Sequence, residues 1–190
     1  MEVQIPLMFL GHVAGLVYAP KHMFVMGIDP GLSVCGYGVI EHLTSGDRAI
    51  AAGVMRTDGS RSVAERLNEL HRDLSALTSE HQPEAMAIEQ IFTNRNLRTA
   101  ISVGRASGVA LLVAAQAGIP VFEYTPSAVK AAVAGYGGAS KDQIRYAVAS
   151  RLQLPAEPEQ ADAADALAVA LCHSQQGKGM ARIKAATEAQ

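Results

Sequence analysis

The segment that most constrains the fold is apolar on almost every side. Residues 161–173 read ADAADALAVALCH, and Asp165 is the only charged residue between Ala163 and Leu171. A helix without a polar face is normally buried, so this segment predicts a helix inside the core. Two carboxylates, Asp162 and Asp165, nevertheless stand at its start, where an unpaired buried charge is costly.

The sequence of this segment allows two interpretations of these aspartates. Aspartate is common at helix N-termini, where its oxygens accept from free backbone N–H groups and its charge suits the helix dipole. Residues three apart also share a helix face, so both carboxylates could bind one hard cation, which prefers oxygen ligands. More carboxylates in suitable places would decide between a cap and a metal site.

Apolar periodicity divides most of the chain into strands and helices. Buried strands are expected at 24–31, 35–43 and 48–57, with turns at Pro30–Gly31 and Ser45–Gly46–Asp47. Apolar residues at helical spacing predict a helix over 62–81, capped by Ser60 or Ser62. The remaining segments predict strands at 85–92 and 120–126, and helices at 97–118, 127–136 and 140–152.

The connections between these elements predict the sheet. The first three strands follow one another through short turns and should form an antiparallel meander, whereas the last two follow helical crossovers and should pair in parallel. We therefore expect an α/β fold with a mixed five-stranded sheet flanked by helices on both faces. Ligand sites in such sheets lie outside the carboxyl ends of the strands.

Two more carboxylates end apolar strands. Asp29 closes the first strand and Glu89 the fourth, and each taken alone also fits an ordinary strand end that reaches solvent. If the two strands are neighbours, both acids lie on one edge, and the helix that begins near Asp162 can bring Asp162 and Asp165 there. Four such carboxylates repel one another unless cations neutralise them, and two Mg²⁺ ions at such a site serve in-line displacement at phosphorus.

Composition sets broad limits on function. The chain has 190 residues, enough for one domain with a real core. Its formal net charge of −2 argues against a generally basic nucleic-acid binder but allows a local basic face. Cys35 and Cys172 lack metal-like spacing, which favours a reducing, cytoplasmic compartment.

The two ends of the chain differ from the middle. Residues 1–22 are apolar, contain glycine and proline, and lack the basic start of a signal peptide. We expect them to be a disordered extension, with a weak membrane anchor as the alternative. The tail at 176–190 is polar, and we expect it to be flexible and frayed.

Four ordered blocks resemble the RuvC family of Holliday-junction resolvases: GIDPGLSVCGYGVI, AIEQIF, VFEYTPSAVKAAVAGYGGASK and QADAADALAVA. The resemblance implies a ribonuclease H-like nuclease domain at 23–175, a homodimer, and two Mg²⁺ ions per subunit, which Mn²⁺ can replace. It implies paired symmetric nicks in four-way junction DNA during homologous recombination and DNA repair. RuvA and RuvB, the branch-migration proteins, are the implied partners, and no membrane is involved. The family's catalytic, metal-binding acids correspond to Asp29, Glu89, Asp162 and Asp165.

The resemblance also suggests DNA-binding residues. Lys130 and Lys141 match basic positions near the scissile phosphate, and Phe92 matches an aromatic that enters the junction centre. Arg95 and Arg98 belong to the polar stretch after Phe92 and are expected to contact phosphates, which position DNA without specifying its sequence. The helix at 97–117, with many small residues, is the expected dimer surface.

Two other functional classes remain in view at this point. Actin-like ATPases and sugar kinases also place an Asp-Gly turn after a first strand, but they have two such domains and a second phosphate loop. An inactive DNA-binding or scaffold protein could share the fold, although all four acidic positions are intact here. Metal-dependent nicking of a four-way junction, ATP turnover, or binding without cutting would separate the three.

Overall fold

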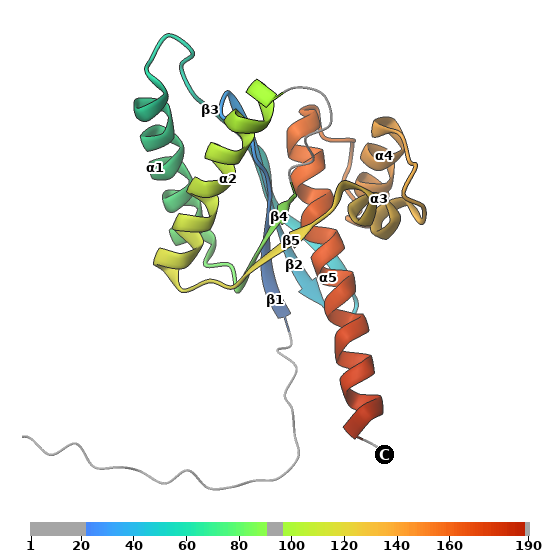
Figure 1. Ribbon diagram of the computed structural model, residues 1–190. Helices are drawn as coiled ribbons and strands as arrows, with labels where there is room; N and C mark the ends of the chain where they lie inside the picture. The colour runs from blue at the N-terminus through green and yellow to red at the C-terminus, as the bar shows by residue number, and fades with distance from the viewer. Residues whose placement is uncertain (1–21, 91–96, 189–190) are drawn as a thin grey trace, which may run out of the picture.

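The computed structural model describes the backbone of residues 22–90 and 97–188 and the side chains of 23–90 and 97–176. A twisted sheet lies between two layers of helices (Figure 1). The elements, in chain order, are β1 His22–Asp29, β2 Val34–Leu43, β3 Gly46–Arg56, α1 Val63–His81, β4 Ala85–Glu89, α2 Leu97–Ala117, β5 Val121–Tyr124, α3 Pro126–Ala134, α4 Lys141–Arg151 and α5 Ala161–Glu188.

The five strands form one mixed sheet in the order β3-β2-β1-β4-β5. The pairs β1–β2 and β2–β3 are antiparallel, whereas β1–β4 and β4–β5 are parallel. The expected meander and the two parallel additions are therefore confirmed. In the parallel β1–β4 pair Ile28 lies opposite Ile88, so Asp29 and Glu89, the next residue of each strand, end at the same edge of the sheet.

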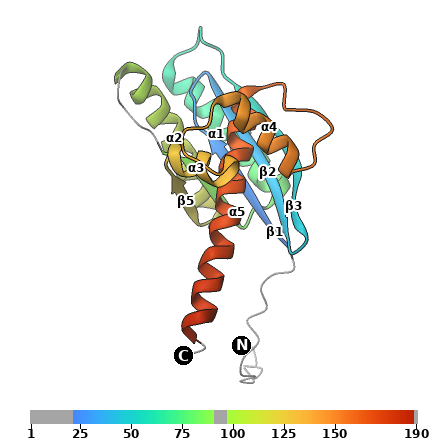
Figure 2. The same ribbon diagram turned by 90° about the vertical axis from the view of Figure 1, so that its right-hand side faces the viewer.

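Helices cover both faces of the sheet, as expected. Helices α1 and α2 lie on one face, and α3, α4 and α5 lie on the other, which faces the viewer in Figure 2. Successive side chains of a strand point to opposite faces, and β1 accordingly contributes Met26 and Ile28 to the core under α1 and α2 but Val25 to the core under α5. Both cores are closed by aliphatic side chains such as Leu70 and Leu167.

Helix α5 is the buried helix that its apolar sequence predicts. Every side chain from Ala166 to Ser174 is buried. The helix does not end at Gln175 but continues to Glu188, beyond the lower edge of the sheet in Figure 1; the flexibility expected of the tail stays a prediction. Alanine, lysine, arginine and methionine are strong helix formers, and extending an existing helix avoids the cost of nucleation.

Local capping decides where the other helices begin. Of the two candidate caps of α1, Ser62 is the one used: its hydroxyl accepts from the backbone N–H of Glu65, whose carboxylate accepts from Ser62 N–H. Ser60 instead donates to Asp58. Helix α4 has the same reciprocal cap between Ser140 and Gln143, which sets the position of its first residue, Lys141.

Candidate active site

Four acidic residues belong to one edge of the sheet, where β1 and β4 end and α5 begins. Asp29 and Glu89 end the neighbouring strands β1 and β4. Helix α5 begins at Ala161 beside the same strands and carries Asp162 and Asp165 in its first two turns. The predicted gathering of these four residues is what the fold produces, because all three elements start or stop at one edge.

Three glycines allow α5 to approach the sheet so closely. A Cβ added at Gly36 would lie 2.0 Å from the backbone oxygen of Asp162, and one at Gly27 would lie 2.1 Å from that of Ala166. At Gly38 it would lie 2.8 Å from the side chain of Leu167. Because these positions have no side chain, α5 packs directly against the backbone of β1 and β2. A side chain at any of them would push Asp162 away from Asp29.

The sequence analysis did not predict this close contact between α5 and the glycines of the sheet. Its signal was present, because Gly36 and Gly38 are two residues apart in a strand and therefore face the same side. A strand that presents two glycines to one side offers close approach to another backbone. The all-apolar helix and the glycine pair were visible separately, but their contact joins residues more than 120 positions apart.

Two of the four carboxylates, Asp29 and Glu89, have raised pKa values. The pKa of Asp29 is raised from 3.8 to about 7, first by burial and then by the negative charges of Glu89, Asp165 and Asp162. The pKa of Glu89 is also raised, by burial first and then by Asp165. Such mutual effects require negative charges that are close together and poorly solvated, so the site is an acidic cluster that attracts cations.

One cation of the protein itself reaches this cluster. The ammonium of Lys141 donates to Asp165 Oδ2 at 3.2 Å, and this carboxylate is the main cause of the raised pKa of Lys141. Lys130, in α3, lowers the pKa of Glu89 by its charge, against the upward effect of burial. Two of the predicted DNA-binding lysines therefore lie beside two of the predicted catalytic acids.

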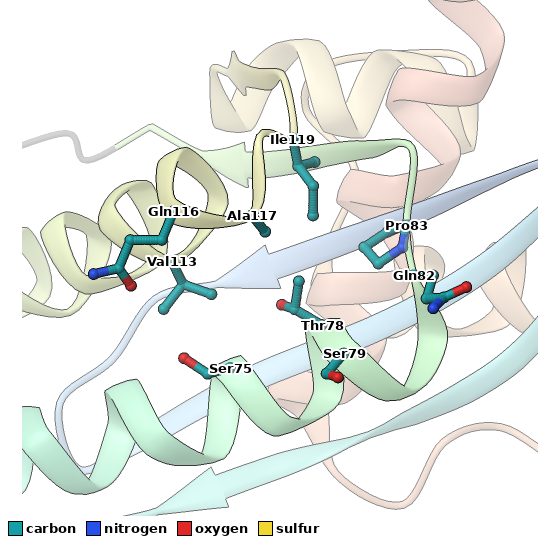
Figure 3. Close-up of a pocket in the computed structure, with 9 residues that line it drawn as sticks. All are labelled: Ser75, Thr78, Ser79, Gln82, Pro83, Val113, Gln116, Ala117 and Ile119. Atoms are coloured by element: carbon teal, nitrogen blue, oxygen red, sulfur yellow. The ribbon is translucent and has the colours of Figure 1, made fainter. Parts of the chain in front are cut away.

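Two of the acids share a cleft of about 250 Å³ with the two lysines; it is lined by Glu89, Pro126, Val129, Lys130, Lys141, Ile144, Asp165 and Ala168. A larger cavity, of about 490 Å³, lies between the C-terminal halves of α1 and α2 (Figure 3). Its described lining consists of hydroxyl, amide and apolar side chains, without an ionisable group. Chemistry, not size, therefore marks the smaller cleft as the candidate site.

The donor set suits a hard divalent cation. Carboxylate oxygens are the ligands that Mg²⁺ and Mn²⁺ prefer, and bound positive charge would relieve the repulsion that raises the pKa of Asp29. Within residues 23–90 and 97–176, no group of three or more acidic, histidine or cysteine side chains already has the spacing of a metal site. Asp29, Glu89, Asp162 and Asp165 thus provide the right atoms and charge, and cation binding would have to draw them closer.

The other predicted DNA contacts are placed less completely. Phe92 and Arg95 lie outside the described residues. Arg98 is exposed in the first turn of α2, and it is not among the described residues that line the cleft. The structure therefore brings Lys130 and Lys141 to the acids, while a role for Arg98 stays a prediction.

Comparison with known proteins identifies the family. The family profile described as "Crossover junction endodeoxyribonuclease RuvC" matches residues 25–173. The chain belongs to the RuvC family. The RuvC of Pelotomaculum thermopropionicum is 49% identical over 152 residues, which cover 80% of this chain and 93% of that protein. The RuvC of Salinispora arenicola is 48% identical over 167 residues, covering 87% and 95%.

Solved structures agree with the RuvC assignment. Thermus thermophilus RuvC superposes with a TM-score of 0.77 at 35% identity, over 82% of this chain and 96% of that one. The same protein in complex with a Holliday junction substrate gives 0.76 at 37% identity, over 80% and 93%. The yeast mitochondrial Holliday junction resolvase Ydc2, 13% identical with a TM-score of 0.57 over 79% of this chain and 78% of that one, shares the fold alone.

These comparisons confirm the ribonuclease H-like α/β fold and the RuvC resemblance. They decide against the actin-like ATPase or sugar-kinase alternative, because the RuvC profile covers nearly the whole of the described sheet and its helices. The four carboxylates and two lysines described above all lie within the matched residues 25–173.

Proposed function

We propose that this chain is a Holliday-junction resolvase, a nuclease that places paired symmetric nicks in four-way junction DNA during homologous recombination and repair. The observation that carries the proposal is the cluster of Asp29, Glu89, Asp162 and Asp165 in a RuvC-family chain, two of whose acids line a cleft with Lys130 and Lys141. A family member of 37% identity has been solved with a Holliday junction substrate. Residues 23–175 make up the nuclease domain in this proposal.

The four acids hold two Mg²⁺ ions per subunit, or Mn²⁺ in their place. When bound, these cations supply an acidified water and stabilise charge at the scissile phosphate. The protein's own part is to hold four carboxylates on two strands and one helix whose backbones pack tightly. Loss of any one carboxylate removes both a ligand and a negative charge from this set.

The lysines act on the phosphate. Lys130 and Lys141 line the same cleft as Glu89 and Asp165, so a phosphate that reaches the acids also meets two ammonium groups. Ammonium groups bind phosphate oxygens as point charges and make binding sensitive to salt. Arg95 and Arg98 extend this grip along the backbone of the DNA, and Phe92 enters the junction centre.

Two nicks related by symmetry need two sites related by symmetry, which a C2 homodimer provides. Helix α2 offers the surface: Ala106, Ser107, Ala110, Val113 and Ala114 are buried against the chain's own core. The opposite side exposes Leu97, Ile101, Leu111 and Leu112, with exposed fractions of 74, 46, 39 and 50%. An apolar stripe of this kind marks an interaction site.

Gly108 tests the dimer. It is exposed, and a Cβ added there would meet nothing within 4 Å in the described chain, so Gly108→Arg should leave the fold intact. We expect Gly108→Arg to be monomeric by light scattering and to nick the two strands independently. A dimeric variant would place the interface elsewhere.

By length and composition α2 is also the one helix among the described residues that could cross a membrane. Its inner side, however, packs into the core of the nuclease domain, so we propose a cytoplasmic enzyme without a membrane partner. RuvA and RuvB, the branch-migration proteins, are its proposed protein partners.

The deciding experiment is cleavage of a synthetic four-way junction by the purified protein with Mg²⁺, beside Asp29→Asn and an EDTA control. We expect paired nicks from the wild type alone and junction binding by both proteins, because phosphates are held by lysine and arginine. Binding without cutting by the wild type would favour a scaffold role and overturn the proposal.

A further inference from the structure

The loop that follows Asp29 is held from outside by three hydrogen bonds. The hydroxyl of Thr57, just after β3, donates to the backbone oxygen of Leu32 at 2.6 Å. The backbone N–H of Thr57 donates to the backbone oxygen of Ser33 at 3.3 Å. Nη2 of Arg66, in α1, donates to Ser33 Oγ at 2.8 Å. Thr57 and Arg66, neither of which belongs to an element that carries one of the four acids, therefore fix the loop between β1 and β2.

Arg66 and Thr57 form a relay. Nε of Arg66 donates to Thr57 Oγ1 at 2.9 Å, and the same hydroxyl donates onward to the Leu32 carbonyl. A hydroxyl both accepts and donates, so the chain of bonds needs a hydroxyl at position 57. It also needs a side chain at position 66 that donates from two separate nitrogens, Nε and Nη2, which the fixed fork of a guanidinium provides, whereas a lysine would have to donate both bonds from one ammonium nitrogen.

The loop is short enough to pass this constraint to Asp29. Only residues 30–33 separate the end of β1 from the start of β2, and Pro30 and Leu32 are buried. The turn is closed tightly, since a Cβ added at Gly31 would lie 2.1 Å from the backbone oxygen of Val34. A shift of Leu32 therefore cannot be absorbed within the loop and moves the carboxyl end of β1.

Asp29 has a reason to need such support. Three other carboxylates, Glu89, Asp162 and Asp165, act on it as like charges, and their repulsion pushes it out of the cluster. We infer that Arg66 is a positioning residue, which acts through Thr57 and the loop to hold Asp29 where it binds a divalent cation. The inference rests on the proposed function in assigning Asp29 as a metal ligand.

Metal binding by the purified full chain tests this inference directly. We expect Arg66→Lys to raise the Mn²⁺ dissociation constant, measured by calorimetry on EDTA-treated protein, about tenfold, the lower end of the effect of residues that orient metal ligands. The Mg²⁺ concentration for half-maximal nicking should rise in parallel, while junction binding without metal stays unchanged. The matched control is Arg72→Lys, because Arg72 lies on the same helix and bonds the neighbouring Asp73.

A second pair of variants separates positioning from general stability. Thr57→Val removes the hydroxyl at nearly constant shape and should weaken Mn²⁺ binding as Arg66→Lys does, whereas Thr57→Ser keeps the hydroxyl and should restore it. The double variant Arg66→Lys with Thr57→Val should be no worse than either single one, because both break the same relay. A merely structural role would lower the melting temperature without this pattern in metal affinity.

Several results would overturn the inference. Unchanged Mn²⁺ binding by folded Arg66→Lys, or equal weakening by Arg72→Lys, would show that the relay does not support Asp29. If Arg66→Lys failed to fold, Thr57→Val would serve in its place, and a normal Mn²⁺ affinity of Thr57→Val would also show that the relay does not support Asp29. Weaker junction binding with a smaller salt dependence would make Arg66 a phosphate contact instead. A wild type that binds Mn²⁺ but does not cut the junction would defeat the proposed function and leave the relay standing.

Discussion

The carboxylates at the two ends of the sheet have opposite surroundings: like charges at one end and hydrogen-bond donors at the other. At one end Asp29 lies among like charges, those of Glu89 and the two aspartates of α5, and Lys141 is bonded to Asp165. At the other end each acid has its own partner. His42 lies 2.5 Å from Asp47, which also accepts from Ser174 at 2.8 Å.

Glu41 completes this second end. It accepts two hydrogen bonds from Arg48, at 3.1 and 2.6 Å, across the β2–β3 hairpin. An acid held by donors, as Glu41 is at Oε2 and Asp47 at both oxygens, stabilises the fold, whereas an acid among other acids destabilises it until a cation binds. The comparison indicates that the acidic cluster lowers the stability of the fold and suits cation binding, whereas the paired acids of the hairpin end stabilise the fold.

The largest effect should come from a ligand of the cleft. We expect Asp165→Asn to reduce single-turnover nicking of a four-way junction with Mg²⁺ by about 10³-fold, the scale on which transition-state charge stabilisation is lost. Its melting temperature without metal should not fall, because the change removes one like charge. Near-normal nicking would take Asp165 out of the site.

The second effect concerns stability at the same end. Because the folded-state pKa of Asp29 is raised from 3.8 to about 7, the folded protein binds its proton more tightly than the unfolded chain and loses stability as pH rises from about 4 to 7. Asp29→Asn lacks this loss. In EDTA at pH 8 we expect it to be more stable than the wild type by about 4 kcal/mol.

The pH series provides the control for that variant. The stability difference between Asp29→Asn and the wild type should shrink toward pH 4, in urea denaturation followed by circular dichroism. A stability difference that is constant between pH 4 and pH 8 would show that burial and like charges do not raise the pKa of Asp29.

At the hairpin end the same kind of change should have the reverse result. Asp47→Ala removes the carboxylate that pairs with both His42 and Ser174 and leaves them only their 3.3 Å contact with each other, which should cost about 2 kcal/mol of stability. Nicking at a temperature where the variant stays folded should equal that of the wild type. If Asp47→Ala lost activity but kept its stability, the contrast between the two ends would fail.

The smallest effect is a pH dependence of metal binding. Asp29 must lose its proton to bind a cation, so the Mg²⁺ concentration for half-maximal nicking should rise about tenfold for each pH unit below 7 and level off above it. Nicking rates against Mg²⁺ at pH 5.5, 6.5 and 8 would measure this. A half-maximal concentration that is independent of pH would mean that another group controls metal binding.

Much of this architecture was predictable because its causes are local. Apolar runs ending in Asp29 and Glu89 define two strands, and short or helical connections define how they pair. The all-apolar start of α5 predicts its own burial. Even the cluster of four acids follows from chain order, since strand ends and a helix start at one edge of the sheet.

Local patterns were insufficient where two good alternatives competed. Ser60 and Ser62 both suit an N-cap, and only the reciprocal bond with Glu65 selects Ser62. The polar composition after Gln175 suggested fraying, but the helix formers there continue α5 to Glu188. Phe92 and Arg95, outside the described residues, stay predictions.

By itself the sequence predicted the strands, the helices and their pairing, because these depend on periodicity and on neighbours along the chain, while its resemblance to the RuvC family proposed the roles of the four acids. Only the tertiary structure decided how Gly36 seats α5, how Lys141 reaches Asp165, and how Arg66 supports the loop after Asp29. The physical reason is that these contacts join residues from 9 to 126 positions apart, each on a different element or loop. Their geometry depends on how whole elements pack, which no local pattern encodes.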